Sequence, residues 1–167
     1  MDPTTIQPFI TSIQNVFSTM MQLQVSSGEP RIKSSNTGEH DVSGINGLTG
    51  DMVGSVALSF PIETATNVVS LFCGLKVDPS SPDFADAIGE LGNMVSGGAK
   101  AMFHGRKVSI SCPSVVLGNN HVIACQSGVP CIVIPCMTDC GDFVIEVAIK
   151  NNDGAKATRT KATTAHA

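Results

Sequence analysis

The chain has 167 residues, of which 42% are hydrophobic and 14% are charged, and its formal net charge is −4. This length and composition indicate one globular domain with its own hydrophobic core and exclude a fully disordered chain. The negative charge and the absence of Trp and Tyr argue against nucleic-acid binding, because that function needs basic patches and usually aromatic stacking platforms.

No stretch approaches the run of about 20 apolar residues that a membrane-spanning helix needs, so no membrane association is expected. The N-terminus has no basic start followed by an apolar segment, and we therefore expect no signal peptide and a cytoplasmic location. In that compartment the six cysteines are expected to be reduced thiols rather than disulfides.

Apolar spacing predicts three helices. In the first, Pro8 is expected in the first turn, where its missing N–H costs nothing. The second should end at Gly74, and the third should begin with Ser81 as its cap and be closed by Gly105. The predicted ranges are 7–25, 62–73 and 82 to about 103.

Alternating and β-branched segments separated by Gly, Asn and Asp predict a set of short strands. The last two are rich in Val and Ile and should form the centre of the sheet. The predicted ranges are 31–34, 42–48, 52–60, 107–111, 114–117, 122–126, 131–137 and 143–150.

This order of elements predicts an α+β fold of a single domain, with the helices packed on one face of a mostly antiparallel sheet. The domain is expected to cover residues 1–150. The segment 151–167 is rich in Lys, Thr and Ala and has no core residues, so a disordered tail is expected there. A sheet edge that pairs with a second copy is a weaker expectation.

The third predicted helix has two distinct faces. At about 100° per residue, one face is apolar and is expected to be buried. The opposite face carries Asp86, Glu90, Asn93 and Gly97, each about one turn from the next, so two carboxylates and a carboxamide should point outward together. The apolar stripe consists of Phe84, Ile88, Leu91, Val95 and Met102.

Glycine is unusually frequent in and just after this helix, although each interior glycine weakens a helix by about 0.5–1 kcal/mol relative to Ala. One interpretation is that another backbone approaches the helix from outside. The other is that the glycines only permit tight packing inside the protein. The positions are Gly89, Gly92, Gly97, Gly98 and Gly105.

The spacing Asp86-x-x-x-Glu90-x-x-Asn93, followed by Gly97, resembles the signature of the CheC/CheX/FliY family of chemotaxis phosphatases. Other segments in the same order resemble CheX-type members of that family: its opening helix (7–21), its first hairpin (50–60) and its closing strands (113–118 and 141–146). The similarity covers roughly residues 5–150 and implies a CheC/CheX-like fold and a homodimer.

The resemblance implies a phosphatase that acts on the aspartyl phosphate of a CheY-like response-regulator receiver domain. In that family scheme Asn93 positions the attacking water and Glu90 pairs with a lysine of the receiver. Asp86, Gly97 and Met94 are predicted to contact the partner around this pair. No cofactor of the chain's own is expected, since the phosphorylated receiver is expected to supply Mg²⁺.

CheC-type members carry a second signature on another helix. Here the corresponding helix offers Glu63, but Thr66 stands three residues later and Asn67 is one position late, so one site per chain is predicted.

The spacing of Glu90 and Asn93 alone also fits a solvated helix face, because Glu and Asn on the outside of a helix usually contact only water. A non-catalytic receiver-binding or scaffold module of the same fold is therefore the alternative function.

A cysteine-based metal or redox protein is a third possibility. Zinc sites usually show tighter C-x2-C pairs than are present here. Strand alternation also places Cys131 and Cys136 on opposite faces, so no metal site is predicted. Cys73 and Cys112 are expected in the core, and Cys140 is expected to be the most exposed thiol.

Overall fold

The computed structural model describes residues 2–123, 125 and 127–154. Within them the chain forms three helices and eight strands, many of them short. In chain order they are α1 (Pro3–Met21), β1 (Ser26–Ser27), β2 (Arg31–Ile32), β3 (Val42–Gly50), β4 (Met52–Phe60), α2 (Ile62–Cys73), α3 (Pro82–Ala101), β5 (Val108–Ile110), β6 (Ser114–Leu117), β7 (Ile132–Thr138) and β8 (Gly141–Asn151).

All eight strands belong to one sheet with the order β1-β7-β8-β4-β3-β5, while β2 also pairs with β7 and β6 also pairs with β3. Each of these pairings is antiparallel. The Val- and Ile-rich β8 lies between β7 and β4, which confirms its predicted central position. The α+β architecture predicted from the sequence is therefore correct.

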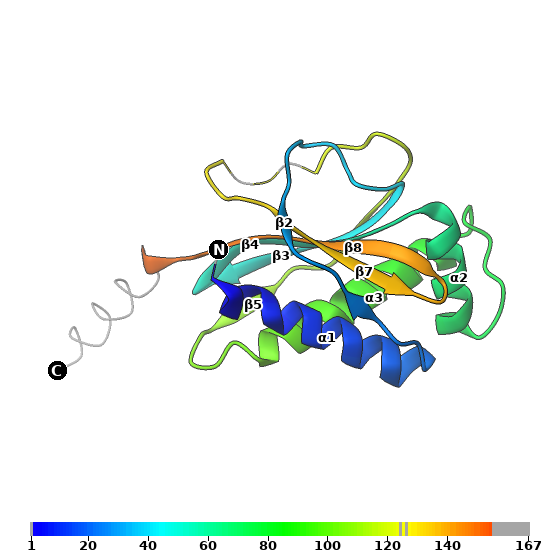
Figure 1. The fold of residues 1–167 in the computed structure, drawn as a ribbon, viewed down its shortest axis with the longest axis horizontal. Helices are drawn as coiled ribbons and strands as arrows, with labels where there is room; N and C mark the ends of the chain where they lie inside the picture. Colours follow the sequence, from blue (N-terminus) through cyan, green and yellow to red (C-terminus); the bar gives the residue numbers. More distant parts are fainter. Residues whose placement is uncertain (1, 124, 126, 155–167) are drawn as a thin grey trace.

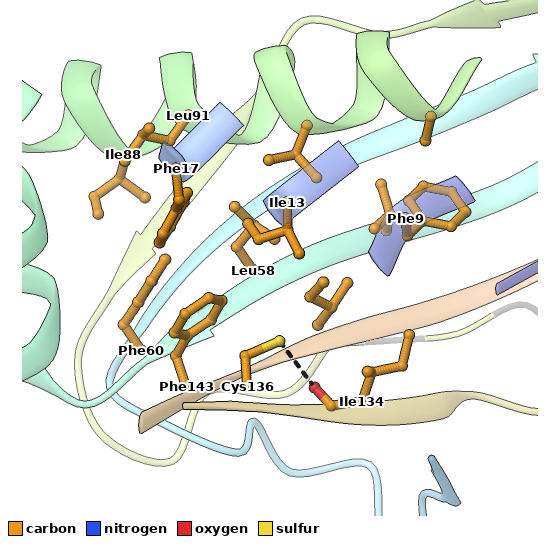
Figure 2. Packing of buried hydrophobic residues seen from close by; sticks show 14 of the residues in the cluster. Phe9, Ile13, Phe17, Leu58, Phe60, Ile88, Leu91, Ile134, Cys136 and Phe143 are labelled. Carbon is orange, nitrogen blue, oxygen red and sulfur yellow. Dashed lines mark hydrogen bonds between the residues drawn. The ribbon is translucent and has the colours of Figure 1, made fainter. Parts of the chain in front are cut away.

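The helices cover one side of this sheet. Figure 1 shows α1 and α3 side by side along one face, α2 near one end of the sheet, and the β2–β3 loop with most of the β6–β7 loop on the opposite side. Apolar side chains fill the space between helices and sheet, and Figure 2 shows residues of α1 and α3 pointing toward those of the strands. Burial of each such side chain contributes on the order of 1.5–3 kcal/mol to the hydrophobic driving force.

Aromatic contacts join the two layers of this core. Phe143 of β8 stacks on Phe17 of α1 with ring centroids 5.4 Å apart and on Phe60 of β4 with centroids 4.8 Å apart. Phe9 meets Phe103 edge to face at 5.9 Å. The first helix is thus anchored to the sheet at one end and to the end of α3 at the other.

The first helix begins earlier and ends earlier than predicted. It starts at Pro3, because Asp2 caps it by accepting a hydrogen bond from the backbone N–H of Thr4 at 3.0 Å. Pro8 consequently lies inside the helix and not in its first turn, so that prediction is wrong. The helix ends where Gln22 adopts a left-handed conformation, with φ of 52°.

The other two helices agree closely with expectation. Helix α2 has the predicted bounds and ends at Gly74, whose φ is +72°. Helix α3 starts at Pro82, and the Ser81 hydroxyl caps it by accepting from the N–H of Asp83 at 3.2 Å. It ends two residues before the predicted limit, at Ala101.

The predicted strand at 122–126 is not present in the described part of the segment. Val122 forms only an isolated bridge with Thr37. Residues 124 and 126 lie outside the described residues. The described residues of this segment lie in a loop, where Val122 is exposed and Ile123 is buried.

Two polar contacts fix these loops to the sheet. The Nζ of Lys33 donates to Glu146 of β8 at 2.7 Å, and both side chains are almost completely buried. A ring nitrogen of His121 lies 2.8 Å from the hydroxyl of Ser43 in β3. Buried charges need such a partner, because an unpaired charge in the interior carries a large desolvation penalty.

The C-terminal end of β8 runs slightly past the predicted domain boundary. Asn151 pairs with Met52, and the backbone N–H of Asn152 donates to the carbonyl of Asp51 at 2.8 Å. Residues 155–167, which contain most of the predicted disordered tail, lie outside the described residues. The domain 1–150 and its tail therefore stay a prediction.

Three glycines of α3 allow this helix to pack closely against neighbouring residues. A side chain at Gly92 would meet the Oδ1 of Asn46 at 2.9 Å, and one at Gly89 would meet Pro113 at 3.1 Å. A side chain at Gly98 would collide with the hydroxyl of Ser12 in α1. Three of the glycines thus permit close packing inside the protein, whereas the Cβ position of Gly97 faces open space.

The adjacent pair Gly97 and Gly98 provides a direct test of this packing. We expect Gly98→Ala to lower the free energy of unfolding by about 1–3 kcal/mol, because the new methyl group must displace Ser12. That movement would also break the 2.6 Å hydrogen bond from the Ser12 hydroxyl to the carbonyl of Val95.

The matched control is Gly97→Ala, which should raise stability by up to about 1 kcal/mol because Ala favours the helix and meets no neighbour. Urea denaturation measures both. Equal effects of the two substitutions would contradict the packing described here.

Candidate functional site

The outward face of α3 carries the residues predicted from the sequence. Asp86 and Glu90 are exposed, and Asn93, Met94 and Gly97 are half-buried. On the opposite face the predicted stripe is buried except at Met102, which lies just past the end of the helix and is half-buried. Helical geometry places Glu90 and Asn93 one turn apart. The structure therefore brings a free carboxylate and a carboxamide together at the surface.

The side chain of Asn93 is held from beneath. Its Oδ1 accepts a hydrogen bond of 2.7 Å from the Nδ2 of Asn46, which lies in β3 and is only 1% exposed. The same Nδ2 also donates to the backbone carbonyl of Ser111 at 3.2 Å. The Nδ2 of Asn93 has no hydrogen-bond partner among the described residues, so its two donors are available at the surface.

The Glu90 carboxylate has no ion-pair partner among the described residues. In the described part of the chain the two ion pairs are Arg31–Glu39 and Lys33–Glu146, and neither involves the Glu90 carboxylate. A surface carboxylate without a cation of its own can pair with a cation of a docking partner. The geometry therefore offers Glu90 as a contact to a partner and Asn93 as an oriented polar group beside it.

The connection between β5 and β6 forms one border of this site. Ser111 is tied to β3 twice: its N–H donates to the carbonyl of Gly47 at 2.9 Å, and its hydroxyl accepts from the N–H of Gly47 at 2.8 Å. Pro113 lies against Gly89 of α3. These contacts fix the position of the backbone next to Asn46 and Asn93.

Asn46 is absent from the residues predicted from the sequence. Within β3 the positions that face the helices are Val42, Gly44, Asn46 and Leu48, and all four are buried. A polar side chain in an otherwise apolar register is a recognisable signal, because a buried amide needs specific partners. Its partner on α3 could be identified only once the helix was placed on the sheet.

Helix α2 shows no comparable pair. The Asn67 side chain donates to the carbonyl of Cys140 at 3.2 Å, and the Thr66 hydroxyl donates to the carbonyl of Ile62 one turn earlier. Glu63 is exposed at the start of this helix. Asn67 is thus engaged with the β7–β8 turn rather than oriented beside Glu63.

Cys131 and Cys136 lie on opposite faces of the sheet. Among the described residues, no three His, Cys, Asp or Glu side chains lie close enough together to hold a metal ion. Cys131 packs in a small cluster with Val129 and Ala148, whereas Cys136 belongs to the main core on the other face of the sheet. The prediction that these two thiols point apart is confirmed.

Two predictions about cysteine exposure are wrong. Cys73 and Cys112 are exposed and not in the core, and Cys140 is half-buried and packs against the main core. Cys73 ends α2 and Cys112 lies in the β5–β6 connection, so both fall at element ends that the apolar pattern does not resolve. Burial and the neighbouring Asp139 raise the pKa of the Cys140 thiol.

Burial should divide the thiols into reactive and protected groups. It raises the pKa of Cys136 to about 12, and burial together with Cys125 raises the pKa of Cys131 to about 12. Because the thiolate is the nucleophile, iodoacetamide near pH 8 should modify Cys73 and Cys112 rapidly and leave Cys131 and Cys136 unmodified. Peptide mass spectrometry measures this, with urea-unfolded protein as the control for full reactivity. Rapid modification of native Cys136 would contradict the described core.

No helix in the described part of the chain is long and apolar enough to cross a membrane.

Comparison with known proteins identifies the family of this chain. The family model described as chemotaxis phosphatase CheX matches residues 42–137, a segment that includes Asn46 and all of α3.

Similarity to individual CheX proteins supports this match. The CheY-P phosphatase CheX of Thermotoga maritima is 32% identical over 123 residues, which cover 72% of this chain and 79% of that protein. The crystal structure of a chemotaxis protein CheX from Desulfovibrio desulfuricans has a TM-score of 0.80 and 35% identity, and the match covers 89% of this chain and 99% of that one.

A third similar structure includes a partner. The crystal structure of the CheX–CheY–BeF3–Mg²⁺ complex from Borrelia burgdorferi contains a chain that matches with a TM-score of 0.75 and 27% identity, covering 88% of this chain and 98% of that one. The sequence match, the identity to a curated relative and the shared fold lead to one conclusion: the chain belongs to the CheX family of chemotaxis phosphatases.

Proposed function

We propose that this protein hydrolyses the aspartyl phosphate of a CheY-like receiver domain, using Asn93 to position the attacking water and Glu90 to dock the receiver. The observation that carries the proposal is the fixed carboxamide of Asn93 at the surface of α3, one turn from an exposed, unpaired carboxylate. The Thermotoga relative is a CheY-P phosphatase by name, and the Borrelia complex contains CheY, BeF3 and Mg²⁺.

The reaction needs a water molecule in line with the bond from phosphorus to the receiver's aspartate. Water attacks phosphorus, the bond to the carboxylate oxygen breaks, and aspartate and inorganic phosphate are the products. An accessory protein can accelerate this step mainly by positioning the nucleophile. Mg²⁺ bound by the receiver would supply charge compensation, so the chain needs no cofactor of its own.

Asn93 suits this task because a carboxamide both accepts and donates and does not titrate. Its Oδ1 uses one lone pair for Asn46, which leaves a second lone pair to accept a hydrogen bond from the attacking water. Its free Nδ2 can donate to a phosphoryl oxygen. A Gln orients the attacking water in GTPases in a comparable way.

Glu90 has a docking role in this proposal. Its exposed carboxylate can pair with a lysine of the receiver, which would bring the phosphoryl group next to Asn93. Asp86, Met94 and Gly97 surround the pair on the same helix, and the open space at Gly97 permits close approach of a partner backbone. The homodimer expected from the resemblance is retained as part of the proposal.

Removal of the carboxamide tests the catalytic role. Asn93→Ala should lower the rate of receiver dephosphorylation by on the order of 10²-fold or more, since loss of a positioning group can cost that much. Phosphate release from a phosphorylated, Mg²⁺-loaded receiver of the same organism measures it. The matched control is Asn67→Ala on α2, which should retain native activity.

The same measurement separates the phosphatase from a scaffold of the same fold. If native protein binds the phosphorylated receiver but does not accelerate phosphate release, the scaffold function replaces the proposal.

Glu90 should affect docking more than chemistry. Glu90→Ala should raise the KM for the phosphorylated receiver and weaken its binding, and the loss should shrink at high salt because salt screens the native ion pair. Titration of the receiver at low and high ionic strength measures this. Glu63→Ala, which removes an exposed carboxylate from α2, is the control and should change neither quantity. An unchanged KM in Glu90→Ala would remove Glu90 from the proposed docking site.

A further inference from the structure

We propose that Asn46 is a positioning residue that fixes the amide of Asn93 in the orientation the reaction needs. The inference rests on the proposed function of Asn93 and adds to it a buried residue from a different element. Asn46 does not reach the surface, so it acts only through Asn93.

The orientation of both amides follows from one backbone carbonyl. The carbonyl of Ser111 can only accept, so the group of Asn46 that faces it must be the Nδ2 donor. The Nδ2 has two hydrogens, and the second is directed to Asn93. The group of Asn93 that meets it must therefore be the Oδ1 acceptor, which leaves the Nδ2 of Asn93 facing outward.

The Ser111 carbonyl is itself well fixed. Two hydrogen bonds between Ser111 and Gly47 join this residue to β3, immediately next to Asn46. The chain of contacts thus runs from the backbone at Ser111 through Asn46 to Asn93. A flipped Asn93 would set one NH2 group against another, so the network favours a single orientation.

Gly92 leaves the space that this arrangement needs. The Oδ1 of Asn46 is buried without a hydrogen-bond partner among the described residues, and it would lie 2.9 Å from a Cβ at position 92. An unsatisfied buried acceptor costs stability. We infer that this cost is tolerated because the other end of the same amide holds Asn93, as expected for polar groups retained at a functional site.

For the reaction, the consequence is that the Asn93 amide samples fewer conformations. A free Asn side chain on a helix samples several rotamers and both amide orientations, whereas catalysis needs the water-binding oxygen in one place. The hydrogen bond from Asn46 restricts Asn93 before the receiver arrives. Loss of Asn46 should therefore reduce turnover without changing the docking surface.

The first test measures whether loss of Asn46 lowers kcat while leaving the KM nearly unchanged. Asn46→Ala should lower kcat for receiver dephosphorylation by about 10-fold or more and change the KM by less than about twofold, since misplacement by about 1 Å can cost 10²-fold. The matched control is Ser43→Ala, which removes a buried polar group from the opposite face of the same strand and should leave kcat unchanged. Thermal unfolding of each variant shows whether the fold is intact at the assay temperature.

The second test is a double-mutant cycle. In an Asn93→Ala background, Asn46→Ala should have no further effect on the residual rate, because its effect passes through Asn93. A general structural defect would lower the rate in both backgrounds alike. If Asn46→Ala does not fold, Asn46→Leu keeps approximately the shape of the side chain, removes the donor, and should show the same loss of kcat at nearly unchanged KM.

The outcomes of the two proposals are distinguishable. If Asn93→Ala loses activity but Asn46→Ala and Asn46→Leu retain native kcat, the positioning role of Asn46 is overturned and the proposed function stands. If Asn93→Ala retains native activity, the catalytic role of Asn93 fails and the role of Asn46 fails with it. Additive losses in the double variant would also overturn the positioning role.

Discussion

The close contact between α3 and β3 is the constraint on which the site depends. Glycine stands on both sides of this contact: a side chain at Gly44 would press against the backbone of Ile88, and one at Gly92 would press against Asn46. The short distance lets a buried amide of the sheet reach an amide on the outer side of the helix. Glycines normally weaken a helix, and close packing against neighbouring elements explains Gly89, Gly92 and Gly98 of α3 but not Gly97.

Helix α3 has one buried face and one outward face. Phe84, Ile88, Leu91 and Val95 of α3 are completely buried in the core between the helices and the sheet, which holds the helix in place. A helix held in place by its core presents its outward residues at constant spacing, which favours a preorganised site. The loops on the far face of the sheet contribute a separate stabilising contact through the buried Lys33–Glu146 pair. The outward face of α3 is therefore accessible while the domain remains well packed.

Much of the fold followed from local sequence signals. The hairpin of β3 and β4, the bounds of α2, and the start of α3 at Ser81-Pro82 agree with the structure because turn and capping residues mark them directly. The errors fall where local signals compete. Pro8 suggested a first turn, but Asp2 and Pro3 form an earlier cap. Val122 and its neighbours have strand-like composition, but in the described part they lie in a loop over the sheet.

The sequence by itself determined the α+β class, the amphipathic character of α3 and the outward grouping of Asp86, Glu90 and Asn93, because helical periodicity is a local property of the chain. The exposure of Cys73 and Cys112 and the contact of Asn46 with Asn93 were decided only by the tertiary structure. Asn46 and Asn93 are 47 residues apart, and Ser111 lies a further 18 residues along the chain from Asn93. Their contact depends on how closely a helix packs on a sheet, which is set by shape and volume across the whole core rather than by any local pattern.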